Sequence, residues 1–169
     1  GYQAGFTTDL NPVTYPQTQA THVGTQSGRG AWINPKSTSL GYRSLYSYDS
    51  VSNNNWGNTI GRNVAIGDSA MALTYGPSNV SIGTEALGRA RNAGRNAAVG
   101  DSAMGDALQV YENVAIGYKS LINATRTSPT ATGNTATGAY SLNQLTSAIW
   151  NTANGYFALE NDTTGSENT

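Results

Sequence analysis

Two aspartates at equivalent repeat positions are the residues of this chain best placed for acid–base chemistry. Asp68 and Asp101 each follow a repeated glycine and lie two repeats apart. At the strand spacing of about 4.8 Å, they would lie roughly 9–10 Å apart. A glycosidase holds its two carboxyl groups about 5–9.5 Å apart in a cleft, so the spacing is at the limit. Glu85 is offset from their line by one residue. We expect the aspartates to cap turns on a flat surface, and we predict no catalytic residue and no enzymatic activity.

Aromatic residues near amides and a carboxylate form the second chemical group. The stretch 45–60, LYSYDSVSNNNWGNTI, contains Tyr46, Tyr48, Asp49 and Trp56 around three consecutive asparagines. Such side chains suit stacking on sugar rings and hydrogen bonding to hydroxyls. The structural alternative is that Trp56 covers a coil edge or packs at a subunit interface. We name these four residues as candidate receptor contacts.

Residues that occupy equivalent positions in different repeats should line up, and this predicts two further surfaces. Tyr42, Tyr118 and Tyr156 should align on one face, where we expect them to pack one coil on the next. Binding of a glycan is the alternative. Thr135 and Thr137 resemble the paired threonines of ice-binding solenoids, but the equivalent positions elsewhere are mostly Val and Ile. Ice binding is therefore a minor alternative.

Composition excludes several classes of partner. Only 11% of the 169 residues are charged and the net charge is −1, which disfavours binding to a phosphate backbone. The chain has no cysteine and a single histidine, His22, so we predict no metal site and no cofactor. No apolar run approaches the roughly 20 residues of a spanning helix, and no cleavable signal is present, so we expect no membrane insertion.

A repeated motif accounts for most of the chain. NVAIGDSAM at 63–71 recurs as NVSIGTEAL, NAAVGDSAM, NVAIGYKSL, NTATGAYSL and NTANGYFAL. The period is 17 residues, and a near-fixed short period is the signature of a solenoid. Insertions fall at about 5–20, 45–60 and 122–133. We divide the chain into less regular coils at 1–62 and regular coils at 63–169. The chain starts in mid-repeat and ends at the start of one, so we expect it to be part of a longer fibre.

Each repeated residue type has an expected structural task. The three residues before the glycine alternate in the manner of a strand, and we predict a second short strand after it. The fold would be all-β, a parallel β-solenoid. Glycine provides positive φ at a corner, whereas asparagine tolerates the left-handed region and forms an amide ladder between coils. Small residues allow close approach, and Leu or Met fills the interior. The expected structural positions are Asn63, Gly67, Asn79, Gly83, Asn96, Gly100, Asn113, Gly117, Asn134, Gly138, Asn151 and Gly155.

The strand triplets also predict self-association. In Val64-Ala65-Ile66 the outer residues point one way and Ala65 the other, so both faces are apolar. Parallel strands that are apolar on both faces are normally covered on both. We therefore expect a homotrimer in which each coil buries its outer face against neighbouring chains.

The motif resembles repeats of known attachment proteins. The NVAIG half is similar to the β-roll heads of trimeric autotransporter adhesins. The full unit NTANGYFALENDTTGSENT, from Asn151 to Thr169, resembles repeats of bacteriophage tail fibres and receptor-binding proteins. Ala20 and Ser37 replace Asn in two upstream units, and Gly28 takes the Leu position.

The resemblance implies a structural and attachment segment of a trimeric fibre in a virion. Its partners would be other fibre or virion proteins and a host surface glycan or protein, contacted through the inserted loops. The head domain of a bacterial trimeric adhesin, at the cell surface, is the alternative. A glycan depolymerase and an ice-binding solenoid are weaker alternatives.

Overall fold

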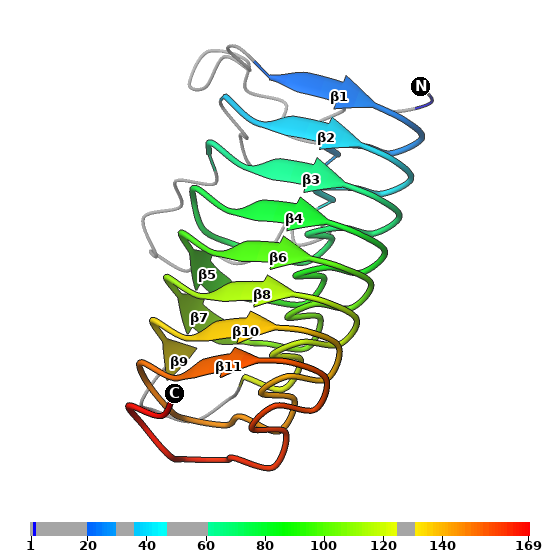
Figure 1. Cartoon of the computed structure of the whole chain (residues 1–169). Helices are drawn as coiled ribbons and strands as arrows, with labels where there is room; N and C mark the ends of the chain where they lie inside the picture. The colour runs from blue at the N-terminus through cyan, green and yellow to red at the C-terminus, as the bar shows by residue number, and fades with distance from the viewer. Residues whose placement is uncertain (1, 3–19, 30–35, 47–60, 125–130) are drawn as a thin grey trace.

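The three residues before each repeated glycine form a short strand, as their alternation predicts. The computed structural model describes residues 2, 20–29, 36–46, 61–124 and 131–169 (Figure 1). Eight strands pair in parallel and in order into one sheet: β1 Thr21–Val23, β2 Thr38–Leu40, β3 Val64–Ile66, β4 Val80–Ile82, β6 Ala97–Val99, β8 Val114–Ile116, β10 Thr135–Thr137 and β11 Thr152–Asn154. The part of the chain that the structure describes contains no helix. The predicted parallel β-solenoid of about 17-residue coils is confirmed.

The structure contains a second sheet of three strands. It lies at a different place in the coil from the second strand that the repeat predicts, and it occurs in fewer coils. It contains β5 Asn92–Gly94, β7 Gln109–Tyr111 and β9 Ala131–Thr132, which pair in parallel. Figure 1 shows these strands stacked beside β6, β8 and β10. They precede the repeated asparagine. The strand predicted after the glycine is absent, because that segment forms a turn in every described coil.

Alternating backbone dihedrals explain why the segment after the glycine is not a strand. The second and fourth residues after Gly67, Ser69 and Met71, have φ of 55° and 53°. Ser69 donates its backbone N–H to Tyr42 in the coil before, and Met71 donates to Ala86 in the coil after. The same φ signs and bond directions recur in the other regular coils. The turn therefore joins each coil to both of its neighbours.

The interior is narrow and is filled mainly by small residues, with a Leu or Met at one repeated position of each regular coil. The central strand residue, such as Ala65, and the third residue after the glycine, such as Ala70, are fully buried. The large side chain is the fourth residue after the glycine, and six of these are at most 3% exposed: Leu45, Met71, Leu87, Met104, Leu121 and Leu142. The predicted tasks of the small residues and of Leu or Met are confirmed.

The asparagines form the predicted ladder through the interior. The Oδ1 atom of Asn96 accepts hydrogen bonds from both the backbone N–H and the Nδ2 of Asn113, at 3.0 and 3.3 Å. Asn113 Nδ2 also donates to the carbonyl of Ala131, three residues before Asn134 in the next coil, at 3.0 Å. The inter-coil bond repeats from Asn63 to Asn168, and Ser37 Oγ substitutes at the start by accepting from the Asn63 N–H.

The residue immediately before each repeated asparagine, and not the asparagine itself, has a left-handed backbone conformation. Arg62, Arg95, Glu112 and Trp150 have φ between 58° and 61°, whereas no repeated asparagine has positive φ. The expectation that asparagine itself takes the left-handed conformation is therefore wrong. Its amide is occupied instead by bonds to the asparagine of the neighbouring coil and to the carbonyl three residues before that asparagine.

Described residues at the ends of two predicted insertions belong to the buried part of the coils. Leu45 and Tyr46, at the start of the predicted 45–60 insertion, are buried as part of a coil. Ala124 and Ala131, within the predicted 122–133 insertion, are also fully buried. The strand register spans these gaps, since Thr38 pairs with Val64 and Val114 with Thr135.

Alanine at the repeated glycines should separate backbone strain from contact between coils. Gly100 and Gly155 both have φ of +133°. A Cβ on Gly100 would lie 2.6 Å from the carbonyl oxygen of Gly117, whereas on Gly155 the nearest atom is 4.0 Å away. We predict that Gly100→Ala lowers the free energy of unfolding by about 2 kcal/mol more than Gly155→Ala, as expected for overpacking. Urea denaturation measures the difference, and equal losses would contradict the coil contact.

Replacing one ladder amide by a carboxylate should destabilise the whole stack. Asn113→Asp removes both donors of Nδ2 and buries a charge against the Ala131 carbonyl and Asn96 Oδ1. We predict a loss of about 3 kcal/mol at pH 7, consistent with unpaired buried polar and charged groups. Asn161→Asp, at an exposed turn position away from the strands, is the control and should change stability by less than about 0.5 kcal/mol. Similar losses in the two variants would refute the ladder's role.

Candidate functional site

The outer face of the eight-stranded sheet is the largest continuous surface that the repeats build. It consists of the first and third residues of each strand, none of which is buried: Thr21, Val23, Thr38, Leu40, Val64, Ile66, Val80, Ile82, Ala97, Val99, Val114, Ile116, Thr135, Thr137, Thr152 and Asn154. Ten of these positions are Val, Leu, Ile or Ala, and all sixteen lack charge. Val23 and Leu40 are 52% and 48% exposed. We call this surface the outer sheet face.

Charged side chains lie on the other sides of the coil. The first two positions after the glycines carry Arg43, Asp68, Glu85, Asp101 and Lys119. Two exposed ion pairs join equivalent positions of neighbouring coils, Arg89 with Asp106 at 2.9 Å and Arg95 with Glu112. Exposed pairs of this kind add little stability. The separation of charge from the outer sheet face indicates a surface suited to contact with another apolar surface.

One of the four predicted receptor contacts lies in the described structure. Tyr46 is 6% exposed, and the Arg43 guanidinium lies 4.5 Å from the centre of its ring. Arg29 approaches the same ring at 5.8 Å. Little of Tyr46 is therefore left for a receptor, because it packs between two arginines. Tyr48, Asp49 and Trp56 lie outside the described residues.

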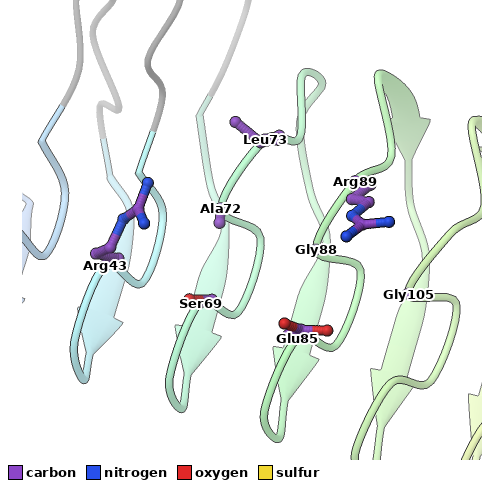
Figure 2. Close-up of a pocket in the computed structure, with 8 residues that line it drawn as sticks. All are labelled: Arg43, Ser69, Ala72, Leu73, Glu85, Gly88, Arg89 and Gly105. Carbon is purple, nitrogen blue, oxygen red and sulfur yellow. The ribbon is translucent and has the colours of Figure 1, made fainter.

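The carboxylates do not converge on a cleft in the described structure. Asp68 and Asp101 each accept a hydrogen bond from the hydroxyl of the next residue, Ser69 and Ser102, at 2.7 Å. These bonds join side chains of adjacent residues, and turn capping through a backbone N–H stays a prediction for the two aspartates. A shallow hollow of about 210 Å³ lies beside this corner, and Glu85 is the one carboxylate among its lining residues (Figure 2). Figure 2 shows Arg43, Ser69 and Glu85 on three successive coils.

A serine–histidine pair does come together, but inside the coil. His22 Nδ1 lies 2.7 Å from Ser39 Oγ, which is 2.6 Å from Ser27 Oγ; Ser27 in turn is 2.9 Å from Ser44 Oγ. The three serines are fully buried. Sequence reasoning missed this network, although His22 and Ser39 occupy the central strand position that is Ala or Ser elsewhere. A hydrolase needs its serine at a substrate-accessible surface, so the network fits a polar packing role.

No metal or membrane element emerges from the residues that are described. Residues 2, 20–29, 36–46, 61–124 and 131–169 contain no cluster of three or more His, Cys, Asp or Glu that could hold a metal ion. The same ranges include no helix long and apolar enough to span a membrane. Comparison with protein-family models, curated proteins and solved structures finds no match to the chain.

Burial of His22 should make stability depend on pH near neutrality. Desolvation lowers its pKa below the ordinary 6.5, so the unfolded chain binds protons that the folded chain excludes. The stability is therefore complete above pH 6.5 and falls as the pH drops through 6.5 toward the folded pKa. We predict a lower thermal midpoint at pH 5 than at pH 7.5.

His22→Ala provides the control, because Ala occupies the same position in most coils and His22 is the single histidine. The variant should lose the change between pH 7.5 and 5, measured by circular dichroism melting curves. If the variant retains the same pH dependence as the parent chain, the assignment to His22 is wrong.

Proposed function

We propose that the chain is a structural and attachment segment of a homotrimeric fibre, as in a phage tail fibre or receptor-binding protein. Its coils would space and stiffen the fibre, and the surfaces away from the threefold axis would contact a host surface glycan or protein. Other fibre or virion proteins would join it along the axis. This function requires no catalytic group, metal or cofactor.

The observation that carries this proposal is the uncharged outer sheet face. Parallel sheets are normally covered on both sides, and here the coil interior covers one side only. Val80 and Ile82 are each 38% exposed in the middle of the sheet, and Ile116 is 43% exposed. Burying these side chains against copies of the same face would remove apolar area from water, at about 25 cal/mol per Å².

The small amount of apolar side chain in the interior gives a second argument for the trimer, based on stability. The interior consists mostly of Ala, Ser and Asn, with few large apolar side chains such as Leu87 and Leu142, so a single solenoid gains little apolar burial from its core. Repeat proteins gain stability from contacts with neighbouring units. Association through the outer sheet face would add contacts along the length of the sheet. Three copies around an axis also agree with the resemblance of the repeats to trimeric fibres and adhesin heads.

The head domain of a bacterial surface adhesin is the second candidate, favoured by the NVAIG half of the unit. It uses the same threefold association, with the bacterial surface in place of the virion. In either setting, three weak sites on one trimer bind a surface more firmly through avidity.

The trimer can be tested by light scattering coupled to size-exclusion chromatography. We predict a mass of three times the 17.6 kDa chain mass. Ile82→Lys, in the middle of the outer sheet face, should reduce the mass to that of one chain, because it places a charge in an apolar contact. Thr84→Lys adds the same charge two residues later, at an exposed corner position, and should keep the trimer.

Two outcomes would contradict the proposal. A parent chain that remains monomeric at micromolar concentration would show that the outer sheet face stays in water. Loss of the trimer in Thr84→Lys as well would assign association to the corner instead of to the sheet.

A further inference from the structure

We propose that the corner formed by Tyr118, Tyr140, Tyr156 and Phe157 is a binding site for the apolar face of a neutral pyranose glycan. We call these four residues the aromatic corner. They occupy the first or second position after Gly117, Gly138 and Gly155, in three successive coils. The aromatic corner lies off the outer sheet face, so this proposal does not depend on the trimer.

The four rings form one continuous array. Tyr140 is central: its ring centre lies 5.3 Å from Tyr118 and 6.2 Å from Tyr156, edge-on in both cases. It stacks on Phe157 at 5.0 Å with an angle of 18° between the rings. Tyr156 and Phe157 are 4.1 Å apart. The sequence pattern aligned Tyr118 with Tyr156, and the structure adds Tyr140 and Phe157 between them.

These rings keep much of their surface in water after packing together. Tyr156 is 69% exposed, and Tyr118 and Phe157 are each 41% exposed. A ladder whose task is only to pack coils would be buried by its neighbours. Here Ala139 occupies the position between Tyr118 and Tyr156, so no large side chain at that position separates the two rings.

Polar groups accompany the apolar surface of the aromatic corner. Three of the four rings carry hydroxyls, and the Lys119 ammonium lies 5.2 Å from the centre of the Tyr118 ring. The side-chain hydrogen bond with Tyr118 raises the pKa of Lys119, whose amine is in any case charged at neutral pH. The C–H face of a pyranose carries slight positive charge and stacks on the negative face of an aromatic ring, while its hydroxyls bond to such groups at the rim.

The size of the aromatic corner favours a sugar over a protein. Three coils span only about 10 Å along the solenoid axis. A stable protein interface covers about 800 Å² on each partner, which is well beyond four partly exposed rings. Two or three sugar units match this length.

The test is titration of the chain with maltohexaose, cellohexaose and chitohexaose, followed by two-dimensional NMR of the backbone amides. We expect millimolar or tighter binding to at least one of them, with shifts centred on residues 117–119, 138–140 and 155–157. Tyr156→Ala should weaken binding at least tenfold, and Tyr156→Phe should stay within about threefold because the ring remains.

Tyr42→Ala is the matched control, since Tyr42 occupies the same repeat position as Tyr156 and is 50% exposed. It should bind like the parent chain, and circular dichroism checks that each variant is folded. Equal weakening in Tyr42→Ala and Tyr156→Ala would overturn the site. Absence of binding to all three sugars at 10 mM would also overturn it and would leave a protein as the occupant to test.

Discussion

The asparagine ladder is the interaction on which the rest of the structure depends. Each Oδ1 accepts two hydrogen bonds from the next coil, and each Nδ2 donates to the carbonyl three residues before the next coil's asparagine, as in Asn96, Asn113 and Ala131. One residue therefore joins its coil to the next coil at two points of the same corner. Because buried polar groups must be paired, a coil that slips by one residue loses several bonds at once. The ladder thus sets the register in which the glycines and Leu or Met side chains meet their equivalents.

This register leaves the surface free to change from coil to coil. The buried positions repeat closely, whereas the second position after the glycine is Arg43, Ser69, Glu85, Lys119 or Tyr140 in different coils. These residues share a positive φ, which costs a non-glycine residue about 1 kcal/mol. Backbone bonds to the coil before offset that cost at every such position. Any side chain can therefore stand there, and this is how the fold can carry charge in one coil and aromatic rings in another.

Much of the fold could be predicted because the same pattern of residue types recurs in successive coils. The strand triplets, the corner glycines, the amide ladder and the buried Leu or Met all follow from residue types at fixed spacing. The turn after the glycine could not be predicted, since Ser69, Met71 and Lys119 carry no local signal for positive φ; their conformation is imposed by neighbouring coils. The site was predicted less well. Tyr46 is buried beside Arg43 of its own coil and Arg29 at the equivalent position one repeat earlier, and residue types alone do not show that both guanidinium groups lie over its ring. The aromatic corner joins two different repeat positions, and sequence alignment keeps these apart.

The chemistry of the outer sheet face changes along the axis, and this bears on how a fibre would be held together. From β3 to β8 the outward residues are Val, Ile and Ala, whereas β10 and β11 present Thr135, Thr137, Thr152 and Asn154. Apolar burial favours association in proportion to area, so the central coils would supply most of the contact energy. The hydroxyl groups and the amide of the last coils can hydrogen-bond either to water or to a partner chain. Separating the chains there therefore costs little free energy. The aromatic corner lies on these same C-terminal coils, and a surface that is held less firmly there leaves room for a ligand. In this arrangement the β3–β8 region would hold the chains together, while the coils of β8, β10 and β11 would present the site.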